Sequence, residues 1–133
     1  MAKLKDSDYA SLARFRYELR KFGRYSERAA GEAGLTPRQH QALLAIRAGP
    51  GGELHVGELA ERLFLRPHSA SELTQRMEEH GLLRREVSAQ DKRQVTLRLS
   101  ERGETVLEYL SQSHRAELRR LRPMLQDLLA GLG

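Results

Sequence analysis

The sequence predicts a mainly α-helical protein with one small β-hairpin. Apolar side chains recur at three- and four-residue spacing over residues 59–63 and again over residues 70–77, as on the buried faces of two helices. Gly81 stands where the second helix would end. Residues 95–99 then alternate apolar and polar side chains, as a strand does. Two helices followed by a hairpin form a winged helix-turn-helix lobe, which we expect over residues 35–99.

Composition limits the classes of protein that the chain can belong to. Its 133 residues suit a single domain, and 39% apolar with 31% charged residues suit a globular fold. No apolar run approaches the ~20 residues of a membrane span, and the first residues lack the apolar core of a signal peptide, so we expect a cytoplasmic protein. The net charge of +5 suggests a polyanionic partner. The absence of cysteine excludes disulfides, thiolate metal sites and thiol-based sensing.

A long first helix is expected over residues 8–33, because residues 6–8 can cap its start and carry negative charge. One face repeats apolar or small side chains in alternating steps of three and four residues, a seam that suits packing against a helix of a second subunit. We therefore expect Leu12, Phe15 and Leu19 to contribute to a dimer interface. The full seam comprises Leu12, Phe15, Leu19, Phe22, Ser26 and Ala29.

A ridge of like charge runs along the same helix, with arginine at every fourth position from residue 16 to residue 28. Each like-charged neighbour at this spacing costs about 0.2–0.5 kcal/mol in an isolated helix. The favoured explanation is that carboxylates, including those of Glu18 and Glu27, neutralise the ridge. The alternative is an anionic ligand or the acidic face of a partner.

The second helix is expected to begin at Pro37 and to end near residue 48. Gly34 ends the helix before it, Thr36 is the N-cap, and Gln39 completes a capping box. The apolar face of this helix comprises Leu43, Leu44 and Ile46.

The segment that follows predicts a turn, a short strand and another helix. Residues 49–52 are rich in glycine but lack the lysine and hydroxyl residue of a phosphate-binding loop. Residues 54–56 are expected to form a strand that pairs with the hairpin. His55 then stands at the start of the next helix, with Glu58 three residues on.

The helix expected from Pro67 to about His80 leaves a polar face opposite its core positions. The major groove of DNA admits one helix, and side chains near the N-terminus of that helix reach the base edges. The alternative is a polar surface helix without a partner, since the glutamates on this helix repel phosphates. The candidate DNA-contacting residues are His68, Ser69, Ser71, Glu72, Gln75 and Arg76.

The tip of the hairpin, residues 88–94, is polar and has no apolar anchor. Such a tip suits contact with phosphates or entry into the minor groove, where arginine is favoured. Asp91 lies two residues before Arg93 and can hold its guanidinium in one orientation through a charge-assisted pair. A solvated loop is the weaker alternative. The candidate DNA-contacting residues of the tip are Asp91, Lys92, Arg93 and Gln94.

A last helical region completes the chain. Ser100 is a good N-cap for a helix that runs to residue 122, where Pro123 is expected to end it. A short final helix then crowds apolar residues on one face, which marks an interface unless the chain's own core covers it. With the seam of the first helix, this predicts a two-fold dimer joined by residues 8–33 and 104–132. The final apolar face comprises Met124, Leu125, Leu128, Leu129 and Leu132.

From residue 35 to about residue 106 the chain resembles the MarR family of bacterial winged helix-turn-helix transcriptional regulators. The resemblance rests on four segments in order: LTPRQHQALLAI, ELAERLFLRPHSASELTQRMEEHGLLRR, DKR at residues 91–93, and VTLRLSERG. The DxR wing followed by an LS-x-x-G helix start is the most specific part. The chain departs from the family pattern at His55 and Gly57, where Thr and Ser are more usual, and at the unusual entry Arg66-Pro67-His68.

The resemblance implies a homodimer in which the first and last helices join two copies of the lobe. It implies that Arg93 enters the minor groove, that Asp91 steadies it, and that the helix from Pro67 reads the major groove. In this family a small, often aromatic and acidic effector commonly binds between the dimerisation and DNA-binding regions and releases the operator. The lack of cysteine excludes the mechanism of the peroxide-sensing members. The candidate effector-pocket residues are Arg16, Tyr17, Arg20 and His40.

Enzymatic and metal-dependent functions are not expected, and no cofactor is implied. The five histidines form no HExxH motif and no close pair at helical spacing. We predict a sequence-specific DNA-binding regulator, a homodimeric repressor of a pseudo-palindromic operator that a small-molecule effector releases. Its expected partners are double-stranded DNA, a second copy of the chain and a small anionic or aromatic effector, and no membrane. The alternative is a non-catalytic helical protein-interaction module that uses the winged-helix lobe.

Overall fold

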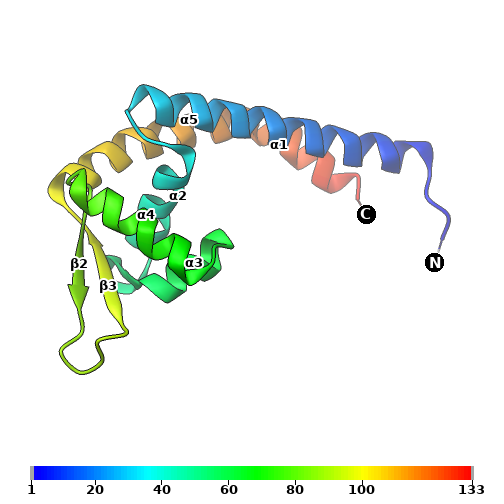
Figure 1. Ribbon diagram of the computed structural model, residues 1–133. Helices are drawn as coiled ribbons and strands as arrows, with labels where there is room; N and C mark the ends of the chain where they lie inside the picture. The colour runs from blue at the N-terminus through cyan, green and yellow to red at the C-terminus, as the bar shows by residue number, and fades with distance from the viewer. Residues whose placement is uncertain (1, 133) are drawn as a thin grey trace.

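The computed structural model describes residues 2–132 and has a small lobe at one end of a long arm (Figure 1). The arm consists of α1 (Asp6–Glu32) and α5 (Glu101–Ala130), which lie side by side, and both chain ends lie near its far end. Within residues 2–132 no helix is long and apolar enough to cross a membrane. The lobe contains α2 (Pro37–Arg47), the 3-10 turn η1 (Pro50–Gly52), β1 (Glu53–His55), α3 (Val56–Leu63), α4 (Pro67–Glu79), β2 (Leu83–Val87) and β3 (Val95–Leu99).

The start and end of α1 follow from local hydrogen bonds. The Lys5 N–H donates to Asp8 Oδ2 at 2.8 Å, so a carboxylate of the first turn satisfies a free backbone donor. At the other end Gly34 adopts φ +81°, and the Leu35 N–H donates back to the Ala30 carbonyl at 2.9 Å. This left-handed glycine and the backward bond end the helix where the sequence predicted.

The predicted break at Pro123 is wrong, because α5 continues through this residue to Ala130. An interior proline removes one helical hydrogen bond and its ring crowds the carbonyl four residues earlier, at a cost of about 3 kcal/mol. The leucines after Pro123 continue along α1, and this packing favours one long helix over two short ones. Together, residues of both helices line an apolar cavity of about 270 Å³: Ser11, Leu12, Phe15, Leu125, Leu128, Leu129 and Leu132.

The capping box of α2 is present as predicted. The Gln39 N–H donates to Thr36 Oγ1 at 3.1 Å, and the Thr36 N–H donates to Gln39 Oε1 at 3.1 Å. The face of α2 differs from the prediction at one residue, because Leu43 and Ile46 are fully buried whereas Leu44 remains half exposed. Leu44 instead lines a cavity beside the arm.

The strands form one antiparallel sheet in the order β1-β3-β2. Leu97 at the centre of β3 pairs with Leu54 of β1 and with Arg85 of β2. The strand before α3 was therefore predicted correctly, although it ends one residue earlier than expected. The His55 N–H donates to Glu58 Oε1 at 3.1 Å, so Val56 already belongs to α3.

The core of the protein lies in the lobe and at the base of the arm. It joins α2, α3, α4, the sheet and the first turns of α5, which places the outer faces of α4 and of the hairpin on one rigid body (Figure 1). Its largest fully buried side chains are Leu43, Ile46, Leu54, Leu59, Met77, Leu83, Leu97 and Leu110.

One residue of the lobe has an unfavourable backbone conformation. Phe64, between α3 and α4, has φ 54° and ψ 43°, and is the only non-glycine residue with positive φ within residues 2–132. For a side chain other than glycine this left-handed conformation costs about 1–2 kcal/mol. The Leu65 N–H donates to the Ala60 carbonyl at 2.9 Å and closes the turn.

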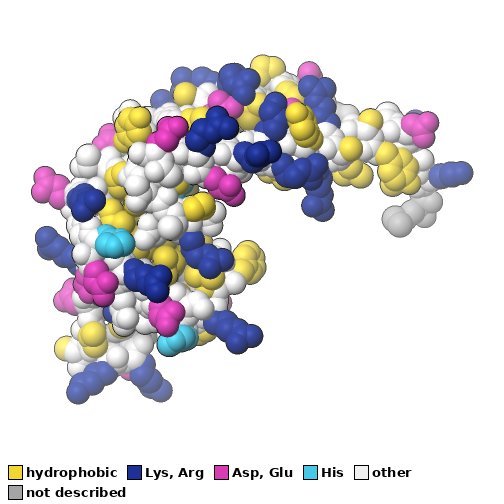
Figure 2. Space-filling model, turned by 45° about the horizontal axis from the view of Figure 1, so that its top comes forward, with side chains coloured by type: hydrophobic (Ala, Val, Ile, Leu, Met, Phe, Trp, Pro, Cys, Tyr) yellow, Lys and Arg dark blue, Asp and Glu magenta, His cyan; other side chains and the backbone are white. Residues whose placement is uncertain are grey.

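Ion pairs within residues 2–132 do not neutralise the arginine ridge of α1. Among residues 2–132, no carboxylate forms an ion pair with the arginines at positions 16, 20, 24 and 28, and Glu18 instead lies 3.8 Å from Lys21 Nζ. The favoured explanation from the sequence was therefore wrong. Figure 2 shows Lys and Arg side chains gathered along the arm.

Candidate nucleic-acid interface

The polar face of α4 is placed largely as predicted. Ala70, Thr74 and Met77 are buried against the lobe, which turns the opposite face of the helix to solvent. The candidate residues on that exposed face are His68, Ser69, Glu72, Gln75 and Arg76.

Ser71 occupies a different position from the one predicted. It is half-buried at the side of α4, where its hydroxyl accepts a hydrogen bond from Arg85 Nη2 at 3.3 Å. The backbone N–H of Arg85 also donates to Glu78 Oε2 at 2.8 Å. These contacts tie the base of the hairpin to α4, so Ser71 fixes the angle between them and does not face outward.

Two side chains in the first turns of α4 lie in polar contact. His68 Nε2 lies 3.0 Å from Glu72 Oε1, and both side chains are exposed. The imidazole therefore occupies one oxygen of the carboxylate, which weakens the repulsion between Glu72 and an approaching phosphate. This pair was not recognised from the sequence, although its i, i+4 spacing was the available signal.

A groove of about 600 Å³ separates the outer face of α4 from the start of α2. Arg38 and Arg76 line its two sides, so guanidinium groups from both helices face the same space. Arg76 was predicted as a site residue but Arg38 was not, because only the fold brings α2 beside α4. The lining residues are Thr36, Pro37, Arg38, Gln39, Gln41, Ser69, Glu72, Leu73 and Arg76.

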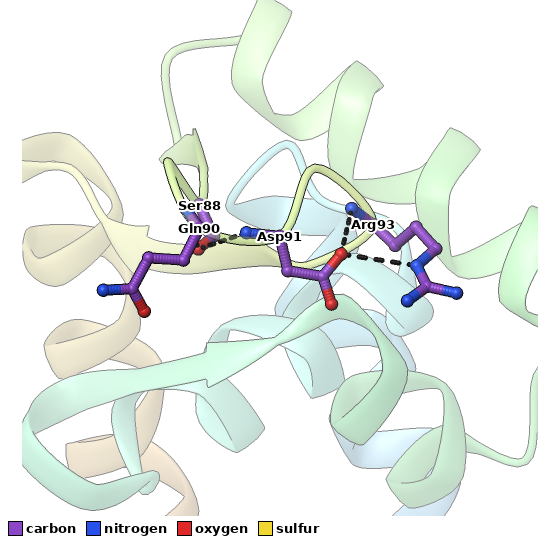
Figure 3. A network of polar contacts seen from close by, with 4 residues as sticks. All are labelled: Ser88, Gln90, Asp91 and Arg93. Atoms are coloured by element: carbon purple, nitrogen blue, oxygen red, sulfur yellow. Dashed lines mark hydrogen bonds and ion pairs between the residues drawn. The ribbon is translucent and has the colours of Figure 1, made fainter.

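The tip of the hairpin has a defined hydrogen-bonded structure (Figure 3). Ser88 Oγ accepts from the N–H groups of Gln90 and Asp91, both at 3.2 Å. Asp91 Oδ1 in turn accepts from the backbone N–H of Arg93 at 3.0 Å and from its Nε at 3.3 Å. The predicted pair of Asp91 and Arg93 is thus present in the structure.

The side chain of Arg93 combines orientation with exposure. It is 92% exposed although its guanidinium is tethered to Asp91. Tethering reduces the rotamer entropy that a long side chain loses when it binds, and exposure leaves the free donors of the guanidinium available. Lys92 and Gln94 are also exposed beside it. Lys and Arg side chains accordingly lie at the lower end of the lobe in Figure 2.

A second site lies between the arm and the lobe, in a cavity of about 560 Å³ bounded by α1, α2 and α5. Of the four candidate effector residues only His40 lines this cavity. Arg16, Tyr17 and Arg20 are exposed on α1 and lie outside it. The cavity is lined by Phe22, Gly23, Ser26, Glu27, Pro37, His40, Gln41, Leu44, Ser111, His114, Arg115 and Leu118.

His114 organises the wall of this cavity and was missed as a pocket residue in the sequence. Its Nδ1 lies 2.7 Å from the Leu110 carbonyl, so Nδ1 carries a proton, and its Nε2 lies 2.9 Å from Ser26 Oγ. The ring packs 4.8 Å from that of His40 and edge-on against Tyr25. The bonds to Leu110 and Ser26 therefore hold His114 in place in either charge state, because Ser26 can donate or accept.

His40 is different, since it is 5% exposed and its Nδ1 has no hydrogen-bond partner in residues 2–132. Burial, and secondly the proximity of His114, hold the pKa of His40 below its ordinary value of 6.5. His40 is thus kept neutral beside an open cavity. A buried nitrogen without a hydrogen-bond partner is costly.

No metal site is formed by the described residues. In residues 2–132 no three histidine or acidic side chains lie close enough together to hold a metal ion. Both nitrogens of His114 are already hydrogen-bonded, so the His40–His114 pair offers no bidentate set.

The residues predicted to dimerise come together on the arm. Leu12 and Phe15 of α1 meet the C-terminal leucines of α5 around the apolar cavity described above. Leu19 lies outside that cavity and is 53% exposed. Packing within the chain therefore covers only part of this apolar surface.

Comparison with known proteins gives one family. The model of the MarR family matches residues 33–94. The HTH-type transcriptional repressor MdtR of Bacillus subtilis (strain 168) is 28% identical over 94 residues, which cover 71% of this chain. The matched segment spans only 59% of the length of that relative.

Solved structures share the fold over nearly the whole chain. AbsC, a MarR family transcriptional regulator from Streptomyces coelicolor, superposes with a TM-score of 0.74 at 21% identity, covering 98% of this chain and 99% of AbsC. A MarR family protein from Bacillus stearothermophilus superposes with a TM-score of 0.75 at 24% identity. The match covers 96% of this chain and 99% of that protein. The S. aureus MepR–DNA complex superposes with a TM-score of 0.66 at 22% identity. The match covers 90% of this chain and 98% of the MepR chain.

Proposed function

We propose that this chain, which resembles the MarR family in sequence over residues 33–94 and in fold over 98% of its length, is a transcriptional regulator that binds double-stranded DNA. The observation that carries the proposal is the exposed Arg93 guanidinium tethered to Asp91, on a hairpin rigidly joined to a helix with a polar outer face. A tethered arginine at a hairpin tip suits the narrow, electronegative minor groove.

In this proposal α4 enters the major groove and the hairpin reaches the minor groove beside it. Gln75 and Arg76 carry side chains whose donors match adenine and guanine edges, respectively. Arg38 faces Arg76 across the groove between α2 and α4, so it is placed to contact the backbone of the same duplex. The MepR structure, which shares the fold, is of a DNA complex, and this supports DNA as the partner.

The active form in this proposal is a homodimeric repressor joined through the arm. The exposed apolar residues of α1 and α5, including Leu19 and Leu129, give a second copy a surface to cover. Two lobes related by a two-fold axis would bind a pseudo-palindrome whose half-sites lie about one helical turn, or ~34–36 Å, apart. Repression rather than activation is supported by the description of MdtR as a repressor.

The regulatory ligand in this proposal is a small molecule that binds in the cavity around His40. Phe22, Leu44 and Leu118 offer apolar contacts, while His40 and Arg115 are titratable or charged residues that line the same cavity. Because the cavity lies between arm and lobe, an occupant that prefers one arm–lobe angle would change the spacing of the two lobes and so their fit to the operator.

The decisive experiment compares two arginine variants in a DNA-binding titration over a range of salt concentrations. Arg93→Ala should weaken binding to every duplex and reduce the slope of log K against log salt by about one, the value for a single phosphate neutralised by an arginine. Arg98→Ala is the matched control, because Arg98 lies on β3 but is already paired with Glu53. If Arg93→Ala and the wild type had the same affinity for DNA and the same salt dependence, the hairpin tip would not be part of the DNA interface.

The same titration separates DNA binding from a protein-interaction function. If the wild-type chain bound neither random duplex nor a genomic DNA pool at low or moderate salt, the lobe would be a protein-interaction module instead. If it binds, selection from a random DNA pool identifies the operator. Gln75→Ala and Arg76→Ala should then alter the selected sequence, whereas Arg93→Ala should not.

A further inference from the structure

Residues 62–66, the last two residues of α3 and the turn that leads to α4, present an aromatic side chain that the fold does not use. Phe64 is 96% exposed, the largest exposure among the large apolar residues of the described chain. Its backbone is in the left-handed region, at φ 54° and ψ 43°. Among residues 2–132 the other positive-φ positions, such as Gly34 and Gly81, are all glycine.

Nothing in the turn requires a phenyl group at this position. The backbone bonds of the turn run from the Phe64 N–H to the Glu61 carbonyl at 3.3 Å and from the Leu65 N–H to the Ala60 carbonyl. A glycine or asparagine would make the same bonds with less strain. Leu63 and Leu65, on either side, are half-buried and anchor the turn. Phe64 therefore combines backbone strain with an unburied apolar ring, and folding explains neither.

The charges beside Phe64 indicate the kind of partner that the turn fits. The turn reads Arg-Leu-Phe-Leu-Arg, so the leucines point inward while Arg62, Phe64 and Arg66 are exposed. Neither arginine forms an ion pair with another described residue. Arg66 is also the N-cap residue of α4, yet its side chain makes no capping bond. Two free guanidinium groups flanking an exposed ring suit a polyanion with apolar edges.

We propose that residues 62–66 form a third DNA-contacting element, in which Phe64 packs against deoxyribose edges and Arg62 and Arg66 bind the adjacent phosphates. This inference rests on the proposed DNA-binding function. Phe64 precedes Pro67, the first residue of α4, by three residues, so their Cα atoms lie within about 11 Å of each other. An element this close to the N-terminus of α4 lies beside the groove that this helix enters.

A second copy of the chain is the less suitable occupant. A two-fold interface places each patch against the same patch of the other copy. Contact through this small patch would bring the arginines at positions 62 and 66 of both copies close together and bury like charges, which is unfavourable. DNA instead supplies phosphates for both arginines and the C–H surface of its sugars for the ring.

The test uses Phe64→Gly in the full chain, with operator DNA and a random duplex as probes. Because glycine suits the left-handed turn, the melting temperature should stay equal or rise. The affinity for both duplexes should fall about tenfold, as expected when a buried aromatic contact is removed. Phe64→Asn, which tolerates the same backbone, should reproduce the decrease. Tyr109→Ala on α5, which removes another exposed aromatic ring, is the matched control and should leave affinity unchanged.

The arginines provide an independent measurement. Arg62→Ala and Arg66→Ala should each reduce the salt dependence of binding, because a protein that neutralises fewer phosphates releases fewer counterions. Affinity of Phe64→Gly within twofold of the wild type for both duplexes would overturn the proposal. So would a Phe64→Gly variant that loses only self-association, because the turn would then join two copies. Failure of the wild type to bind any duplex would instead reject the proposed function itself, before the turn is tested.

Discussion

The lobe and the arm of this protein differ in how far their apolar side chains are exposed to solvent. In the lobe, Leu43, Leu59 and Met77, which all lie on helices, are fully buried by the chain's own elements. On the arm, Leu19 and Leu129 remain 53% and 65% exposed. Both regions are helical and have similar apolar periodicity, so the difference lies in what surrounds each helix. In Figure 1, α4 packs among the other elements of the lobe, whereas α5 is the neighbour along most of α1.

This contrast teaches that helical periodicity predicts which face is apolar but not what covers it. A lobe that is complete by itself can hold the outer faces of α4 and of the hairpin rigidly at any protein concentration. An arm with half-covered leucines would gain stability if a second copy covered them, and this gain would depend on concentration. If the stability of the lobe is independent of a second copy and that of the arm is not, substitutions in the two regions should differ in their dependence on protein concentration.

Leu19→Asp on the arm is expected to reduce self-association and operator affinity more strongly than any other substitution considered below. A charge placed in the exposed seam should prevent self-association while leaving the lobe folded, since Leu19 contributes nothing to the core of the lobe. Without the second lobe, operator affinity should fall by about 10²–10⁴-fold, the usual contribution of a linked second site. Sedimentation and a DNA-binding titration measure the two effects. Ala13→Asp, on the opposite side of α1, is the control and should remain dimeric.

The next effect is expected from Leu97→Ala in the lobe. Leu97 is fully buried at the centre of β3, so truncation should lower the free energy of unfolding by about 2–5 kcal/mol. Urea titration followed by circular dichroism measures this value. The decrease should not depend on protein concentration, because the cavity forms inside one lobe. If the decrease in the free energy of unfolding disappeared at high protein concentration, the stability of the lobe would depend on self-association through the arm.

A smaller effect is expected from pH at the junction between the two regions. The pKa of His40 is lowered in the folded state. Below pH 6.5 the imidazole of the unfolded chain is therefore protonated more than that of the folded chain. The free energy of unfolding should therefore fall as the pH drops below 6.5, by at most about 1.4 kcal/mol per pH unit. The titratable and charged side chains that line the same cavity as His40 are His114 and Arg115 of α5 and Glu27 of α1.

Unfolding curves between pH 7.5 and 5.0 measure this dependence. His40→Gln should flatten the decrease below pH 6.5, since the amide does not titrate. His80→Gln is the control, because His80 is exposed and its replacement should leave the curve unchanged. An identical pH dependence in the wild type and His40→Gln would assign the acid sensitivity to another group.

The smallest effect is expected from Ser100→Ala, at the start of α5. Ser100 Oγ accepts from the Gly103 N–H at 3.0 Å and donates to the Gly81 carbonyl at 2.6 Å, so it joins the arm to the end of α4. Removal of this hydroxyl should cost about 1 kcal/mol of stability, measured by thermal or urea unfolding. Thr105→Ala, one turn further along α5, should change stability by less than about 0.5 kcal/mol.

Local signals in the sequence predicted much of the fold and part of the site. The capping box of Thr36 and Gln39, the N-cap Ser100 and the alternation over residues 95–99 each depend on residues within a few positions of one another. The same holds for Asp91 and Arg93, two residues apart in a tight turn. These features were therefore predicted correctly.

Features that depend on distant segments were missed. His114 and Ser26 are 88 residues apart, and only the packing of α5 on α1 brings them together. The groove between Arg38 and Arg76 likewise requires α2 to lie beside α4. The prediction at Pro123 was wrong for the related reason that packing of the arm outweighs a local helix-breaking tendency.

The sequence by itself determined the caps, the turns, the apolar faces and the polar hairpin tip, because short-range hydrogen bonds and periodicity decide these features. The tertiary structure alone decided which apolar faces are covered, which arginines stay unpaired and which histidine is kept neutral. Those outcomes depend on what surrounds each side chain, and that is set only when α1 and α5 have packed and the lobe has closed around Leu97.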